Sequence, residues 1–180
     1  MDVMNEDVHR VREAALGALQ KLTVGQTELL EGLADCRRQI ETQALVQKTV
    51  TAAGFQTRAF QWGQDLELYF DIFDNGRDIG YISKGWEDRG FRVAELFTIP
   101  LEFAGSLKSR VEDLRQKCAT EGIALTTETD DSELTVKLEC VIYTAGFNQV
   151  SFGNTARYLA RCAALVQDSL AAGAADTLTA

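Results

Sequence analysis

Oxygen-bearing side chains that could offer Ca²⁺ the hard ligands it prefers cluster over a short stretch of the sequence: Asp71, Asp74, Asn75 and Asp78. An EF-hand loop needs acids at alternate positions, a glycine at the sixth position and a glutamate at the twelfth. Here the acids fall at the first, fourth and eighth positions. This spacing favours a solvated hairpin turn over a metal site.

The glycine-containing segment from Gly146 to Asn154 precedes the last expected helix, where backbone N–H groups could receive an anion. It lacks the Gly-Lys-Ser/Thr ending of a phosphate-binding loop and the G-x-G-x-x-G spacing of a dinucleotide site. We therefore interpret it as a loop that caps a helix, with Asn154 or Ser151 as the capping residue.

Histidine and cysteine offer little further chemistry. The single histidine, His9, has no neighbouring cysteine and cannot assemble a zinc site or a catalytic triad alone. No Cys-x-x-Cys pair occurs, and we interpret the widely spaced cysteines as small buried hydrophobic residues: Cys36, Cys118, Cys140 and Cys162.

Paired carboxylates are a third source of chemistry, and Glu67 with Asp71, or Glu87 with Asp88, would lie close together. Among 27 acidic residues such pairs arise by chance. We therefore predict no catalytic residue, no cofactor and no metal, and whether the chain is an enzyme stays open, with a non-enzyme favoured.

The aromatic residues are more informative. Phe70, Phe91, Phe97 and Phe103 fit the apolar face of the expected strands and helix. Another six fall in turns or on less regular faces, where they either pack against the N-terminal helices or form a protein-binding surface: Trp62, Tyr69, Phe73, Trp86, Tyr143 and Phe147.

The charge balance limits the partners. Eighteen Lys and Arg against 27 Asp and Glu give a net charge of −9, which repels a phosphate backbone, so we expect no nucleic acid partner. The N-terminus lacks the apolar segment of a secretory signal, and no run approaches the length of a membrane span. We expect a cytoplasmic protein with no membrane contact.

The elements that would position these residues begin with a proline-free stretch at 6–53. Apolar residues recur there every seven positions, which predicts amphipathic helix: Val8, Ala15, Leu22, Leu29 and Cys36, with Leu19, Leu33 and Ile40 beside them. Because Gly25 follows two β-branched neighbours, we predict a break near it.

After Gly54 the period changes to two, which predicts strands. We expect strands near 66–73, 79–83 and 91–99, a helix at 103–121 that ends at Gly122, strands at 123–127 and 134–142, and a last helix from about 152. The fold class is therefore α+β, with an antiparallel sheet of about five strands in the order α-β-β-β-α-β-β-α and an additional N-terminal helix. The expected parts are a helical segment at 1–53, an α+β domain at 54–172 and a flexible tail at 173–180.

This element order, together with the small size and acidic charge, resembles the type III secretion chaperone fold over residues 27–171. The resemblance rests on order and charge and carries over no binding residue, and the additional N-terminal helix departs from it. It implies a dimer that holds an extended client segment on hydrophobic patches.

We therefore predict a non-enzymatic protein-binding or chaperone-like adaptor that acts as a homodimer through apolar helix and sheet surfaces. Two alternatives stay open. One is a small-molecule sensor or enzyme with its site between the sheet and the N-terminal helices, using Asp71, Glu67 or the 146–154 loop. The other is a structural subunit whose seven-residue stripe pairs with another chain's helix.

Overall fold

The computed structural model describes residues 3–62, 67–85 and 89–178. The chain divides into two compact units, Met1–Ala44 and Leu45–Ala180. The second unit begins at Leu45 because Val46, Thr49 and Val50 are buried in its core. The boundary expected at 53/54 therefore lies nine residues further along the chain than the division in the structure.

The first helix, α1, runs from Val3 to Ala52 without interruption, so the predicted break near Gly25 is wrong. Two threonines on either side of this glycine bond within the helix: the Thr23 hydroxyl donates to the Leu19 carbonyl at 2.9 Å and the Thr27 hydroxyl to the Thr23 carbonyl at 3.0 Å. These bonds stay within the helix, and a single glycine costs only about 1 kcal/mol in a helix interior.

The sheet confirms the α+β class and has six antiparallel strands in the order β1-β2-β3-β4-β6-β5, where about five were expected. The strands are β1 Gln56–Trp62, β2 Glu67–Asp74, β3 Arg77–Lys84, β4 Gly90–Pro100, β5 Ala124–Thr129 and β6 Glu133–Tyr143. The additional strand is β1. Its core-facing positions include Thr57 and Ala59, which are too small to give a strong alternation of hydrophobic residues.

Two further helices follow α1 in the chain, one between β4 and β5 and one after β6. Strand β4 continues through the short η2 helix, Leu101–Phe103, into α2, Gly105–Thr120, and η3, Thr144–Gly146, leads from β6 into α3, Gln149–Leu178. Helix α3 thus continues into the region expected as a tail at 173–180. No helix in the described part of the chain is both long and apolar enough to cross a membrane.

Two predicted turns are confirmed by their backbone angles. Asn75 and Gly76 have φ values of 50° and 82°, as in the two-residue turns that match the twist of a hairpin. Gly122, with φ 76°, follows the end of α2. Its N–H bonds the Ala119 carbonyl, and the Ile123 N–H bonds the Cys118 carbonyl, which is the Schellman pattern.

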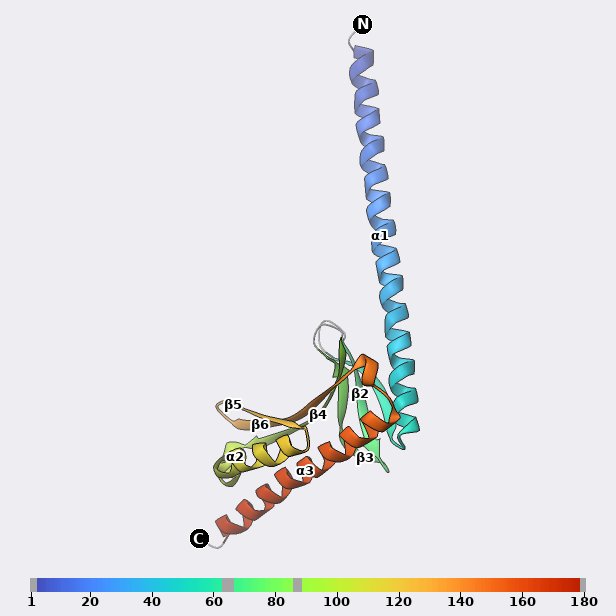
Figure 1. Cartoon of the computed structure of the whole chain (residues 1–180). Coiled ribbons are helices and arrows are strands. Elements are labelled where there is room, and N and C mark those ends of the chain that lie inside the picture. The colour runs from blue at the N-terminus through green and yellow to red at the C-terminus, as the bar shows by residue number, and fades with distance from the viewer. Residues whose placement is uncertain (1–2, 63–66, 86–88, 179–180) are drawn as a thin grey trace. The chain divides into compact units, whose positions relative to one another are not determined.

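Helices α2 and α3 lie on one side of β4, β5 and β6 (Figure 1). Residues of these strands that point toward the helices include the fully buried Val93, Val136 and Leu138. Phe152 and Leu159 of α3 pack against them with no exposed surface. The predicted core residue Phe103 is 59% exposed, because it lies in η2 and not in α2.

The cysteines follow their expected burial only in part. Cys118 and Cys162 are buried and Cys140 is half-buried. Cys36 is exposed on α1, so its predicted burial is wrong for this chain considered alone.

Candidate functional site

The face of the sheet opposite α2 and α3 carries side chains that point to solvent. On this face Leu96 of β4 lies opposite Lys137 of β6, and Thr126 of β5 lies opposite the same lysine. Leu96 is 49% exposed. Together these strands and β3 form an open hollow of about 340 Å³, lined by Tyr81, Leu96, Thr126, Glu128, Thr135 and Lys137.

A row of aromatic rings continues this face across β3, β2 and β1. The ring centroids of Tyr81 and Tyr69 are 5.8 Å apart, and those of Tyr69 and Phe60 are 5.6 Å apart in a stacked arrangement. All three side chains are half-buried. Because neighbouring strands place these residues on one face, the row presents a continuous apolar surface beside the hollow.

Ion pairs lie alongside the aromatic row on β1 and β2 and next to it on β4 and β6. The Arg58 guanidinium lies 2.7 Å from the Asp71 carboxylate, and its carbon is 5.7 Å from the centre of the Phe73 ring. On β6, Glu139 lies 2.7 Å from the Lys137 ammonium and 3.3 Å from Arg92 Nε of β4. The Arg92–Glu139 pair has ionic distance but not hydrogen-bond geometry, so Arg92 Nε keeps its capacity to donate a hydrogen bond.

The six aromatic residues singled out in the sequence do not form one surface. Tyr69 and Phe73 are half-buried on the face of the sheet opposite α2 and α3, which we call the helix-free face. Tyr143 is 69% exposed at the end of β6. The side chain of Trp62 and the whole of Trp86 lie outside the described residues.

Phe147 belongs to the core, where only 6% of its side chain is exposed, and it is therefore not available as a surface residue. Its ring centroid lies 4.2 Å from that of Phe91 and 6.0 Å from that of Phe152. These contacts join η3 to β4 and α3, and they bury the ring although it follows a turn.

Sequence reasoning missed Phe60, Tyr81 and Leu96 as members of this face. The sequence placed Leu96 only within the strand expected at 91–99 and did not show that its partner on β6 is Lys137. Tyr81 could not have been found from the Asn75-Gly76 turn, because the register set by the turn alone would pair it with the core residue Phe70, and only the bulge at Ile72/Phe73 places it opposite Asp71. Phe60 could not have been found from the sequence either, because its strand, β1, was not predicted.

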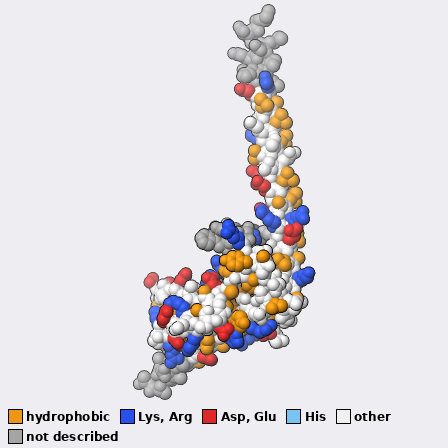
Figure 2. Space-filling model, viewed as in Figure 1, with side chains coloured by type: hydrophobic (Ala, Val, Ile, Leu, Met, Phe, Trp, Pro, Cys, Tyr) orange, Lys and Arg blue, Asp and Glu red, His pale blue; other side chains and the backbone are white. Residues whose placement is uncertain are grey.

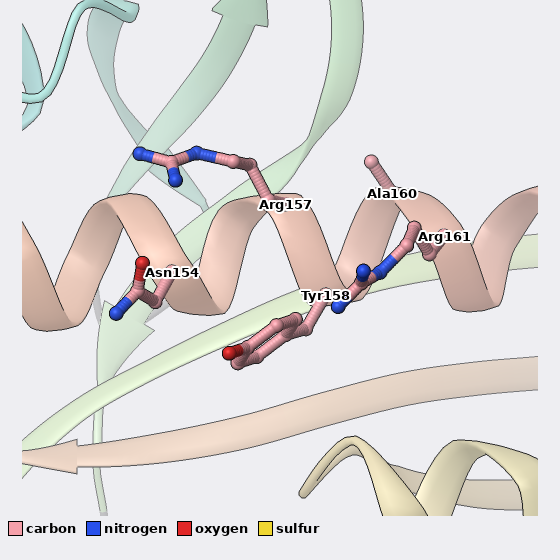
Figure 3. Close-up of a pocket in the computed structure, with 5 residues that line it drawn as sticks. All are labelled: Asn154, Arg157, Tyr158, Ala160 and Arg161. Carbon is pink, nitrogen blue, oxygen red and sulfur yellow. The ribbon is translucent and has the colours of Figure 1, made fainter.

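A second hollow, of about 390 Å³, is lined only by residues of α3 (Figure 3). Arg157 points away from Tyr158 in this view. Arg161 is already engaged, because its guanidinium lies 2.7 Å from the Glu121 carboxylate and 4.8 Å from the centre of the Tyr158 ring. This is the open surface around a single helix, and its groups do not converge on a common point.

The 146–154 loop caps α3, but the capping residue is Asn148. Its side-chain oxygen accepts the N–H groups of Val150 at 2.9 Å and Ser151 at 3.1 Å. The Ser151 hydroxyl oxygen accepts the Asn148 N–H at 3.1 Å, which completes a reciprocal capping arrangement. Asn154 lies exposed inside the helix, so it is not the cap. With these amides bonded, this end of α3 does not offer them to an anion.

The acidic side chains of the β2–β3 hairpin bond to groups beside them. Asp74 accepts from the Asn75 amide at 2.9 Å, and Asp78 accepts from the Gly80 N–H at 2.9 Å. Within the residues that the structure describes, no three His, Cys, Asp or Glu side chains are grouped so as to hold a metal ion. The carboxylates of Glu67, Glu87 and Asp88 lie outside the described side chains.

Burial changes the acidity of four groups. Loss of solvent raises the pKa of Glu95 on β4 to about 7, a shift that Arg77 opposes and Asp78 reinforces. Burial, and a hydrogen bond that its thiol donates to Cys118, raise the pKa of Cys162 to about 12, and burial also raises the pKa of the Cys118 and Cys140 thiols. All three thiols are therefore protonated near neutral pH and are weak nucleophiles.

Comparison with known proteins identifies a similar fold and gives no information about function. No protein-family model and no curated protein matches the sequence. A crystal structure of an uncharacterized protein from Methanothermobacter thermautotrophicus is similar in fold, with 15% sequence identity and a TM-score of 0.52. The similarity covers 71% of this chain and 95% of that one.

Proposed function

We propose that the chain is a non-enzymatic, chaperone-like protein-binding module that docks a client segment on the helix-free face of its sheet. The observation that carries this proposal is the row of Phe60, Tyr69 and Tyr81 beside the hollow at Leu96. Aromatic side chains that keep part of their surface in water are enriched at protein interfaces, where they bury a large apolar area at low entropic cost.

The polar groups around the hollow support a peptide as the ligand. Hydroxyls of Thr126 and Thr135 and the charges of Glu128 and Lys137 surround the apolar centre, as a polar rim surrounds the centre of an interface. The hollow is open to solvent and measures about 340 Å³, which is at the lower end of the range for small-molecule sites. It suits one or two side chains of an extended segment.

The net charge of −9 selects among such segments. An acidic protein attracts basic chains over a distance of about 10 Å at moderate salt. We therefore propose a client segment with large apolar residues flanked by Lys or Arg, held by a homodimer in the manner that the resemblance to type III secretion chaperones implies. The four free thiols support a cytoplasmic setting.

Binding of defined peptides to the full chain tests the proposal. Fluorescently labelled 12-residue peptides would be varied in aromatic content and in net charge, and their anisotropy measured. We expect affinity to rise with both aromatic content and positive charge. Leu96→Asp, which places a charge in the hollow, should weaken binding at least 10-fold, about 1.4 kcal/mol.

The matched control is Val150→Asp, which adds the same charge at a side chain that is 63% exposed on the first turn of α3. It should leave peptide affinity within about twofold of the wild type. Equal binding by the wild type and Leu96→Asp would remove the sheet face from the proposal, and no binding by any peptide would refute the function itself.

A further inference from the structure

Helix α1 carries a long apolar stripe. Between Leu16 and Ile40 eight large aliphatic side chains are 51% to 68% exposed, and all except Val24 follow one stripe: Leu16, Leu19, Leu22, Leu29, Leu30, Leu33 and Ile40. Figure 2 shows hydrophobic side chains following one another along this helix. Soluble chains rarely leave a contiguous apolar surface of this extent in water, so the stripe calls for a covering surface.

The stripe follows the heptad pattern of a coiled coil, in which positions a and d alternate at steps of three and four residues. Positions a are Leu19, Gln26, Leu33 and Ile40, and positions d are Ala15, Leu22, Leu29 and Cys36. Leu16 and Leu30 occupy e positions and widen the stripe. Since α1 is helical throughout this range, these residues form one continuous seam.

Charged side chains lie away from the seam. Of the nine between positions 12 and 44, seven occupy the outer b, c and f positions: Glu13, Lys21, Glu28, Glu31, Asp35, Arg38 and Glu41. The other two, Arg12 and Arg37, are near the ends of the seam, and Arg37 is bonded to Glu41 at 2.8 Å. A solvated single helix would have no reason to separate its charges in this way, whereas a paired helix does.

The area of the seam matches what an interface needs. A Leu or Ile side chain contributes about 60–120 Å² when fully covered, at about 25 cal/mol per Å². The seven side chains therefore offer about 600 Å² on one helix and about 1,200 Å² on a pair, at the lower limit for a stable specific interface. The remaining residues at positions a and d, and the aliphatic parts of neighbouring side chains, add to this area.

We propose that the seam pairs with a second copy of this chain in a parallel, in-register coiled coil. Gln26 favours this arrangement, because only in a parallel, in-register pair does its side-chain amide face the same amide of the partner and form a hydrogen bond with it. In an antiparallel pair each a position faces a d position, and the d positions from 15 to 36 are Ala, Leu, Leu and Cys. A buried polar residue at a is a known device for fixing register.

The same arrangement brings the two Cys36 side chains opposite each other at a d position. Cys36 is exposed in the single chain and is the one cysteine of the four on α1. This pairing deepens the dimeric part of the proposed function and does not depend on client binding, because the seam and the sheet face belong to different units.

The experiment is oxidation of the full chain with diamide, which accepts the two electrons and two protons that two thiols release as their disulfide forms. The wild type should give a dimer band on a non-reducing gel, and Cys36→Ser should give none. In the Cys36→Ser background, Leu29→Cys at the next d position should restore the band, whereas Asp35→Cys at an outer position should not.

Sedimentation equilibrium supplies the second measurement. The wild type should have twice the monomer mass, and Leu22→Asp with Leu29→Asp should raise the dimer dissociation constant about 100-fold or more. Val24→Asp is the matched control, because Val24 is 56% exposed but occupies an outer f position, and it should remain a dimer.

A dimer that Cys36 does not crosslink would overturn the parallel register, and a wild-type monomer would overturn the pairing altogether. The circular dichroism of the sheet should be the same in every variant. Peptide binding measured on the same preparations separates the two proposals: a monomer that still binds peptide refutes the coiled coil alone, and a crosslinked dimer that binds none refutes client docking alone.

Discussion

Glu95 makes the stability of the sheet depend on pH. It lies in the middle of β4 between Val93 and Phe97, and loss of solvent raises its pKa from 4.5 to about 7. In the unfolded chain the same carboxyl loses its proton near pH 4.5, so between pH 4.5 and 7 the folded state binds more protons. Stability contributed by the neutral carboxyl is therefore present at low pH and is lost as the pH rises to 7.

The size of this effect follows from the shift. A shift from 4.5 to about 7 would correspond to about 3 kcal/mol at full strength, since one pKa unit is about 1.4 kcal/mol. The Glu95 side chain keeps partial contact with water, which screens its charge, so we expect about 1 kcal/mol. Glu95→Gln keeps the size of the side chain and removes the charge, and should recover this amount above pH 7.

Urea unfolding followed by circular dichroism at pH 4.5, 6 and 8 would measure the difference between Glu95→Gln and the wild type. We expect the two proteins to be equally stable at pH 4.5 and the variant to be about 1 kcal/mol more stable at pH 8. The control is Glu102→Gln, which removes the same charge from an exposed residue of η2 and should show no such dependence. A difference that does not change with pH, or a variant less stable at pH 8, would refute the reasoning.

Two further predictions concern the backbone. Gly80→Ala should lower the free energy of unfolding in urea by about 3 kcal/mol or more, because φ is +125° and the new methyl group would collide with the Ala94 carbonyl oxygen. Gly54→Ala, with φ +92° and open space around it, should lower it by only about 1 kcal/mol. Equal losses would show that the collision is relieved by a shift of β4. Asn148→Ala should cost about 1 kcal/mol through the loss of the α3 cap, and Asn154→Ala, in the same helix, should be nearly neutral in the same assay; the reverse order would restore Asn154 as the cap.

Features set by neighbouring residues were predictable from the sequence. The β2–β3 hairpin follows from Asn75 and Gly76, which readily adopt positive φ, and the end of α2 follows from Gly122. Each depends on a local conformational preference that needs no distant partner. The antiparallel sheet and its covering helices followed from hydrophobic periods of two and about 3.6.

Features set by distant residues were not predictable in this way. Strand β1 has weak alternation of its own and forms because β2 offers it a free edge, with Thr57 opposite Ile72 and the Thr57 hydroxyl bonded to the Asp71 carbonyl at 2.8 Å. Continuous helix through Gly25 depends on the summed propensity of a long proline-free stretch, which outweighs one glycine.

The candidate face was predictable only in part for the same reason. Tyr69, Phe73 and Tyr143 stand out as aromatics off the core pattern, but membership of one face is a property of strand register. Phe147 has the same local signature and is buried, because Phe91 and Phe152 meet it from other parts of the chain. A pattern along one strand cannot show which rings meet across several.

The strand order β4-β6-β5 has a consequence for synthesis of the chain on the ribosome. Strand β4 is complete at Pro100, but the strand that pairs with its far edge, β6, begins only at Glu133, and α3, which covers both, begins at Gln149. During the interval the nascent chain carries an open strand edge and an uncovered apolar face, both of which promote aggregation. A chain that ends before α3 should therefore need a holding factor during translation, although the finished protein is itself proposed to hold others.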